Sequence, residues 1–222
     1  MPEIACPSCG GPVPLRSAAL PYAVCPYCSA LIARTGDDVA AIGKSAVLPF
    51  DVSPIELGTT LEKDGKRFEA VGRVRWGWSD GSWNEWLLRR PSGENAWLGE
   101  AMGWFMWLTE ATGLEDDPVV RRFAAGEPVL VGEETADGSH TYTVADIKQA
   151  KCLGGEGELP FPCPPSWTMT SLDCRSPEGG ALSLQRDADG VSAWRGQYRD
   201  LADLAPRKLR RIEGWPAPAF AA

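Results

Sequence analysis

The sequence predicts a mainly β protein with a small N-terminal module and a tryptophan-rich all-β region. From about residue 55 onward, short runs rich in Val, Trp, Phe, Tyr and Thr alternate with Asp-Gly, Ser-Gly and Gly-Gly turns, a pattern typical of consecutive hairpins. Helical periodicity is weak over the same region. Similar segments also recur, which favours two related β-meander or barrel-like repeats.

Four cysteines define the N-terminal module. They have the spacing C-x2-C-x15-C-x2-C, which is typical of a four-thiolate zinc ribbon, and Gly10 permits the tight turn after the first pair. Four protein ligands leave no open coordination position, so we expect one structural Zn²⁺ rather than a catalytic one. The predicted ligands are Cys6, Cys9, Cys25 and Cys28.

Three further cysteines lack this pairing. Cys152, Cys163 and Cys174 have no C-x2-C partner, and the single histidine, His140, lies elsewhere in a strand-like stretch. Small buried hydrophobic residues are the usual role of such cysteines, and we expect that role here.

The chain divides into six segments. The connector between the two repeats should form a short helix begun by Asp117 and Pro118 and stopped by Gly126, and a second helix is expected over 195–205. In order, the segments are a zinc ribbon (1–35), a linker (36–52), β repeat A (53–113), the connector (114–126), β repeat B (127–205), and a basic, then Pro/Ala-rich tail (206–222).

The repeat is visible as an ungapped alignment. "KDGKRFEAVGRV" matches "ADGSHTYTVADI", so that Asp64-Gly65 falls on Asp137-Gly138. The second repeat carries an insertion, "CLGGEGELPFPCPPSW", between its halves. Whether the two repeats share one core stays open at this point.

The stretch "RVRWGWSDGSWNEWLLRR" predicts a hairpin turning at Asp80-Gly81. That turn pairs Trp78 with Trp83, Trp76 with Glu85, and Arg75 with Trp86. Strand alternation then separates a packed face from a half-wet face, where Arg75 lies over Trp86 in a cation–π contact. The packed face consists of Val74, Trp76, Trp78, Trp83, Glu85 and Leu87.

Two glutamates are candidate ligand or partner contacts. Glu85 shares its face with indole rings, so its carboxylate must be paired, hydrogen-bonded or protonated. It is either an ion pair to an arginine at the sheet rim, or a ligand contact or acid/base group. Glu158, in the Gly-rich loop "GEGELP", is the second candidate. The candidate surface is therefore Trp76, Trp83, Glu85, Trp86, Arg75 and Glu158.

Charge and hydropathy restrict the partners. The chain has 222 residues and a net charge of −8, which argues against extended binding to nucleic acid. Near the end, Arg207, Lys208, Arg210 and Arg211 form a basic cluster that is either a solvated face or a weak peripheral contact with an acidic partner or membrane surface. No apolar run is long enough to span a bilayer and no signal peptide is recognised, so we expect a cytoplasmic protein.

Several of these motifs resemble an uncharacterised bacterial family, domain of unknown function 4178. The resemblance depends on four segments: Gly65 to Val71, Trp83 to Leu88, Trp97-Leu98, and Gly157 to Pro160. The resemblance covers about residues 50 to 205, and an N-terminal ribbon accompanies members of the family. It implies an accessory role in a membrane-stress or polyamine-related system, because similar proteins occur in gene clusters of these kinds.

Three functions follow from the sequence. The first is a non-enzymatic cytosolic adaptor that contacts a protein partner, because neither a nucleophile motif nor a phosphate loop is found. The alternative is a small-molecule protein or enzyme that receives a cationic ligand in a Trp/Glu pocket. The second alternative is a nucleic-acid-binding zinc ribbon protein.

Overall fold

The computed structural model describes residues 3–17, 19–138 and 140–214. It confirms a mainly β fold, in which thirteen strands of the described residues form one sheet and two more form a separate pair. No helix in the described part of the chain is long and apolar enough to cross a membrane.

The N-terminal module consists of two small β units that carry the cysteine pairs. The first unit pairs β1 (Glu3–Ala5) with β2 (Pro12–Pro14). The second consists of β3 (Tyr22–Val24), β4 (Ala30–Thr35) and β5 (Asp38–Lys44). The predicted linker over 36–52 therefore begins with a strand. Gly36, at φ 62°, lets the chain turn back directly after β4, and Thr35 pairs with Asp38.

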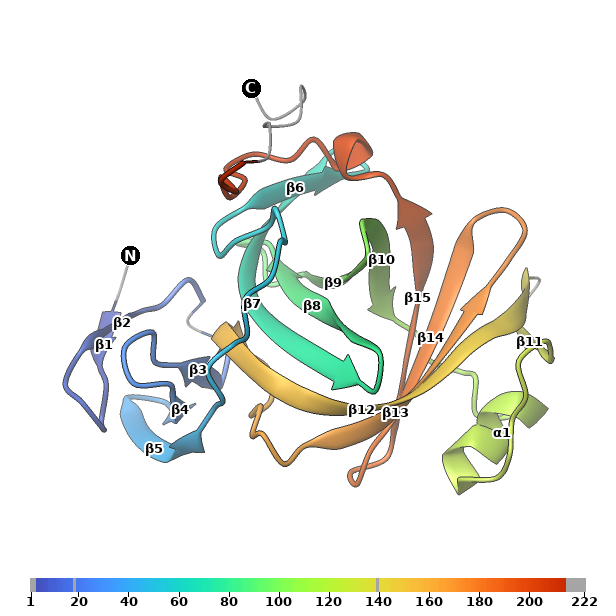
Figure 1. The fold of residues 1–222 in the computed structure, drawn as a ribbon, viewed down its shortest axis with the longest axis horizontal. Helices are drawn as coiled ribbons and strands as arrows, with labels where there is room; N and C mark the ends of the chain where they lie inside the picture. The colour runs from blue at the N-terminus through green and yellow to red at the C-terminus, as the bar shows by residue number, and fades with distance from the viewer. Residues whose placement is uncertain (1–2, 18, 139, 215–222) are drawn as a thin grey trace.

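A closed eight-stranded barrel follows the module (Figure 1). Two four-stranded meanders form it, and the pairings β10–β15 and β7–β12 close it. The first meander is β7 (Lys66–Trp78), β8 (Gly81–Arg89), β9 (Asn95–Ala101) and β10 (Trp104–Glu110). The second is β12 (His140–Leu159), β13 (Thr168–Arg175), β14 (Gly180–Arg186) and β15 (Val191–Arg199).

The aligned segments of the sequence occupy equivalent places in the two meanders. A short strand precedes each meander and forms a hairpin with its first strand: β6 (Thr60–Lys63) with β7, and β11 (Glu134–Asp137) with β12. Asp64-Gly65 and Asp137-Gly138 lie at these two hairpin turns. The insertion of the second repeat lengthens β12 and its connection to β13. The two meanders thus enclose one common interior.

The short helix is present where the sequence predicts it. Asp117 caps α1 (Pro118–Ala125) by accepting hydrogen bonds from the backbone of Val119 and Val120, and Gly126 ends the helix in the left-handed conformation. The second expected helix, over 195–205, is wrong. Residues 195–199 belong to β15, which is paired on both sides, and a single 3₁₀ turn, η1 (Leu201–Leu204), follows.

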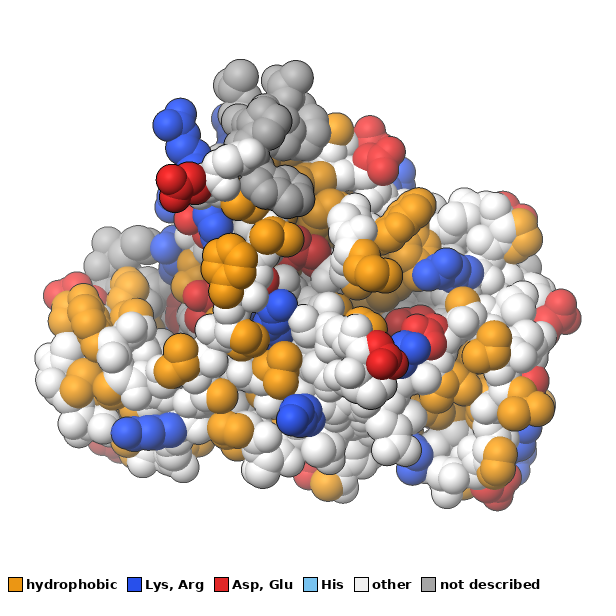
Figure 2. Space-filling view, in the orientation of Figure 1, with side chains coloured by type: hydrophobic (Ala, Val, Ile, Leu, Met, Phe, Trp, Pro, Cys, Tyr) orange, Lys and Arg blue, Asp and Glu red, His pale blue; other side chains and the backbone are white. Residues whose placement is uncertain are grey.

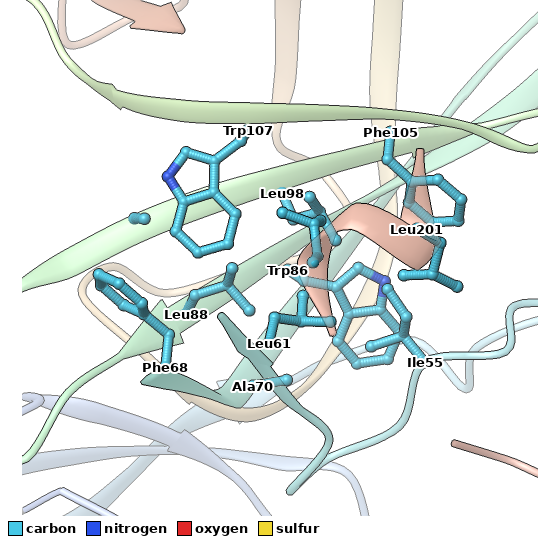
Figure 3. Packing of buried hydrophobic residues seen from close by; sticks show 12 residues of the cluster. Ile55, Leu61, Phe68, Ala70, Trp86, Leu88, Leu98, Phe105, Trp107 and Leu201 are labelled. Atoms are coloured by element: carbon cyan, nitrogen blue, oxygen red, sulfur yellow. The ribbon is translucent and has the colours of Figure 1, made fainter. Parts of the chain in front are cut away.

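Both halves of the barrel are covered on the outside. Helix α1 covers the outer side of β13 and β14, where Leu172 and Leu184 are fully buried. The first meander is covered by β6, Ile55 and η1 (Figure 3). Trp86 is fully buried in the cluster outside the first meander, so its predicted place on a half-wet face is wrong. The covering segments are distant in sequence, and a hairpin pattern alone does not reveal them.

Candidate metal centre and ligand chamber

The four predicted thiolate ligands lie together. Their sulfur atoms are all within 4.8 Å of one another. Two Sγ–Sγ distances, Cys6–Cys28 and Cys9–Cys25, are 3.8 Å. A tetrahedral ion with metal–sulfur bonds of about 2.3 Å requires sulfur atoms roughly 3.8 Å apart. The four cysteines can therefore hold one metal ion without rearrangement.

Local backbone geometry positions the thiolates. After each C-x2-C pair the chain turns back: the backbone N–H of Gly10 donates to the carbonyl of Cys6, and that of Ser29 donates to the carbonyl of Cys25. Both turn residues have positive φ, 74° for Gly10 and 58° for Ser29. The predicted role of Gly10 agrees with this geometry, while Ser29 adopts the same conformation without a glycine.

The tryptophan hairpin turns one residue earlier than predicted, which shifts the pairing of its strands by two residues. Ser79 and Asp80 form the turn, so Trp76 pairs with Trp83, and Val74 pairs with Glu85. The predicted pairs, such as Trp76 with Glu85, are wrong. Because the shift is an even number of residues, each side chain keeps its predicted face. The register changed, but the grouping of Glu85 with the indoles did not.

Glu85 lies inside the barrel. Its carboxylate accepts hydrogen bonds from Nε1 of Trp76 and of Trp83, each at 3.0 Å, and from Nε2 of Gln185 at 2.6 Å. Glu85 is on β8 and Gln185 is on β14, four strands away in either direction around the closed sheet. Side chains on such opposite strands can touch only across the interior. The face shared by Glu85 and the indoles is thus the inner face.

A second carboxylate, Asp173, faces the same interior from β13. It accepts a hydrogen bond from Ser183 Oγ at 2.6 Å. Burial raises the pKa of Asp173, and burial together with the negative charge of Asp173 raises the pKa of Glu85 to about 7. Neither carboxylate forms a salt bridge among the described residues. The predicted ion pair of Glu85 with a rim arginine is therefore not found.

Aromatic rings surround the two carboxylates. Trp76 stacks on Trp83 with ring centroids 6.4 Å apart, and Trp97 stacks on Phe161 at 5.6 Å. Trp83, Trp97, Glu85, Asp173 and Gln185 keep part of their surface accessible, although they face the interior. Figure 2 shows a hollow over the barrel opening between β8 and β15, with acidic side chains inside it. We call this interior the chamber.

A protein-family model described as a domain of unknown function (DUF4178) matches residues 56–200. The chain belongs to this family. No curated protein and no solved structure matches it. The matched range contains the whole barrel, including both chamber carboxylates, and excludes the four cysteines. The chamber thus lies within the DUF4178 domain of this chain, and the four-cysteine module, called the metal module below, is attached to it.

Glu158 joins the two parts of the molecule and does not line the chamber. It lies near the end of β12 rather than in a loop, and its carboxylate accepts from the backbone N–H groups of Arg16 and Ser17 and from the guanidinium of Arg34.

Glycine is common near the end of β12 because this strand lies very close to β7. A Cβ on Gly157, at φ 72°, would lie 2.3 Å from the carbonyl oxygen of Val71.

The predicted contact of Arg75 with Trp86 is also wrong. Arg73 lies over Trp86, with its Cζ atom 4.6 Å from the ring centroid, while Arg75 pairs with Asp51 and donates to Ser82 Oγ. Burial opposes the ionisation of Asp51, but neighbouring guanidinium groups and the Ser53 N–H lower its pKa. Arg75 and Arg73 thus anchor the segment before β6.

The basic cluster near the end of the DUF4178 domain is partly used inside the fold. The guanidinium of Arg210 lies 3.3 Å from Asp51 and also donates to the carbonyl of Ile55. The backbone of Arg207 pairs with Thr60 on β6. The side chains of Arg207, Lys208 and Arg211 remain exposed.

The structure brings together three of the predicted surface residues, Trp76, Trp83 and Glu85, and separates them from Arg75, Trp86 and Glu158. Sequence reasoning missed the polar half of the chamber. The sequence pattern that marks this half is the alternation of polar residues with leucines in β13 and β14. The same alternation is found in strands with one solvent-facing side, so it does not reveal an enclosed face. The missed chamber residues are Ser171, Asp173, Ser183 and Gln185.

Proposed function

We propose that this DUF4178 protein binds a small organic cation inside its barrel. The observation that carries the proposal is the Glu85 carboxylate, which is held deep in the chamber by three neutral donors and has no cationic partner among the described residues. A buried carboxylate without a counter-charge is destabilising, and a bound cation would offset that cost. The neighbouring indole faces favour an organic cation over a hydrated metal ion.

The proposal is of binding rather than catalysis. The donors to Glu85 are indole and amide N–H groups, which hold a carboxylate in place but do not exchange protons with it at neutral pH. Such an arrangement suits recognition of charge, whereas acid/base catalysis requires a group that can pass its proton to a substrate and recover it.

Tryptophan fluorescence is the direct test. Spermidine and choline serve as cationic probes, and glucose is the neutral control. The cationic probes should produce a saturable change in emission that Glu85→Gln abolishes, because this substitution keeps the shape and removes the charge. A response to glucose alone, or the same cation response in the variant, would contradict the proposal.

For the four-cysteine module we propose one structural zinc ion. The support is the 3.8 Å sulfur spacing in a closed set of four thiolates. Thiolate ligands must stay reduced, so the proposal places the protein in the cytoplasm. Elemental analysis should give one zinc per chain, and Cys6→Ser should lose most of it, whereas Cys174→Ser, in the barrel, should retain it.

An adaptor role is the second candidate, within an accessory system of the kind that the family resemblance suggests. It is favoured by exposed apolar side chains on the connection between module and barrel, where Val47 and Phe50 are 83% and 87% exposed. If this connection contacts a partner, Phe50→Asp should abolish capture of that partner by the tagged protein while leaving spermidine binding unchanged. Equal capture by both proteins would exclude this surface.

A further inference from the structure

One end of the chamber is closed by the part of the insertion that connects β12 to β13, residues 160–167, and this connection is called the insertion from here on. Phe161 stacks on Trp97, and Trp167 packs edge-on against Trp76 with ring centroids 4.7 Å apart. Trp76 in turn donates to Glu85. The insertion therefore contacts the aromatic wall that holds the chamber carboxylate.

The metal module forms part of the same closed end. Leu20, from the module, is buried against Val71 and Leu87, with Trp97 packed beside them. Strand β3 of the module pairs with the last residues of β12, which continues the barrel sheet into the module. Apolar side chains of the module thus pack directly against side chains of the first meander.

A chain of contacts connects the metal ligands to this end. Ser29 follows the ligand Cys28, and its carbonyl accepts from the backbone N–H of Ser45 at 2.8 Å. The hydroxyl of Ser45 accepts from the N–H of Gly155 on β12 at 3.0 Å and lies 3.8 Å from Cys163 Sγ, within the insertion. One serine therefore touches the cysteine knuckle, β12 and the closing insertion.

Glu158 forms a second attachment between the barrel and the module. The buried carboxylate of Glu158, on β12, accepts hydrogen bonds from the backbone of Ser17 at 3.1 Å and from Arg34 at 3.3 Å. The backbone N–H of Arg16 donates to the same carboxylate, and removing all three donors of the module would leave a buried carboxylate without them, which is costly. The barrel end near β12 is therefore complete only when the module is folded against it.

We propose that metal binding by the four cysteines controls the closed end of the chamber and, through it, the affinity for the ligand. A module of this size has too small an apolar core to fold without its metal ion. Loss of the metal would free Leu20 and Ser45 and loosen the wall around Trp76. The proposal rests on the proposed cation-binding function, and by linkage the cation must raise metal affinity by the same factor.

The linkage is tested with purified full-length protein and spermidine. Affinity is measured by tryptophan fluorescence with zinc bound and after zinc removal by a chelator. We expect at least about fivefold weaker spermidine binding without metal, and an equal strengthening of zinc binding in saturating spermidine. Unchanged affinities in both directions would overturn the proposal.

A ligand-independent readout separates this proposal from the cation-binding one. Acrylamide quenching reports whether solvent reaches the chamber tryptophans, and it needs no ligand. Zinc removal should increase quenching, while hydrogen exchange in β13 and β14, under α1, stays protected. If spermidine fails to bind but quenching still rises, the cation function fails and control of the closed end stands. If quenching does not change, control of the closed end fails.

Ser45→Ala keeps all four thiolates and removes the hydroxyl that joins β12 to the insertion. We expect the variant to retain one zinc per chain and to show increased quenching even with zinc bound. Ser92→Ala, in the exposed β8–β9 turn, is the matched control and should behave as the wild type. If zinc-loaded Ser45→Ala is quenched no more than the wild type, Ser45 does not connect the cysteines to the closed end. This comparison needs no metal-free protein, so it tests the proposal even if the metal-free chain unfolds entirely.

Discussion

The two meanders of the barrel share a strand plan but present different chemistry to the interior. The first contributes Trp76, Trp83 and Trp97, with Glu85 as its carboxylate. The inward positions of β13 and β14 in the second meander are polar: Ser171, Asp173, Ser183 and Gln185. Outside, both meanders are apolar and covered. The two meanders thus have the same strand arrangement and similar outer packing, while their inner faces differ.

This difference explains how a carboxylate can be held within an aromatic wall. Glu85 comes from the aromatic half, yet one of its hydrogen bonds comes from Gln185 of the polar half. Each half alone would leave polar or apolar groups unmatched, whereas facing one another they form a chamber with aromatic surfaces on one side and hydrogen-bonding groups on the other.

The aromatic half should contribute most to stability. Trp76→Ala removes a fully buried indole and one donor to Glu85, so we expect the free energy of unfolding in urea to fall by about 3–5 kcal/mol. Trp104→Ala is the control, since that ring is 67% exposed, and it should change stability by less than about 0.5 kcal/mol. Similar losses in both variants would contradict the assignment of Trp76 to the core.

Glu85 should make stability depend on pH. The fold raises its pKa from 4.5 to about 7, so the folded state holds a proton that the unfolded state releases above pH 4.5. Stability present below pH 4.5 is therefore lost as the pH rises towards 7, by about 3 kcal/mol. Glu85→Gln should show a smaller loss across this window in urea titrations. If the free energy of unfolding changes with pH by the same amount in both proteins, Glu85 is not the source of the pH dependence.

The two halves should also be coupled electrostatically. The charge of Asp173 raises the pKa of Glu85, so Asp173→Asn should lower that pKa and shift the pH dependence of stability to lower pH. Spermidine affinity should fall roughly tenfold, because one carboxylate is lost from the chamber. Fluorescence titrations at several pH values measure both effects, and an unmoved pH profile would show that the carboxylates act independently.

The smallest effect is expected within the polar half. Ser183→Ala removes the hydroxyl that donates to Asp173 at 2.6 Å, and we expect a loss of about 1 kcal/mol in the free energy of unfolding. Calorimetry of this variant beside Ser92→Ala measures the difference. A loss as large as that for Trp76→Ala would mean that the polar half also forms a packed core, and the contrast between the halves would disappear.

Much of the architecture could be predicted from local patterns. The cysteine spacing predicted the cluster, Asp117-Pro118 and Gly126 predicted α1, and the Asp-Gly pairs marked equivalent hairpins of two repeats. These features depend on residues near one another in sequence. The turn of the tryptophan hairpin was misplaced by one residue, and its strand pairing by two, because Ser-Asp and Asp-Gly are both suitable turn pairs and the closed sheet decides between them.

The sequence by itself therefore determined the strands, the faces of the tryptophan hairpin, the cysteine knuckles and the grouping of Glu85 with indole rings. Only the tertiary structure decided which face became the interior. Alternation separates two faces but does not say which is enclosed, and here both are buried, one by barrel closure and one by segments such as η1 and α1. Closure also brought Gln185 and Asp173 towards Glu85 from strands some ninety to a hundred residues away, and no local pattern contains that information.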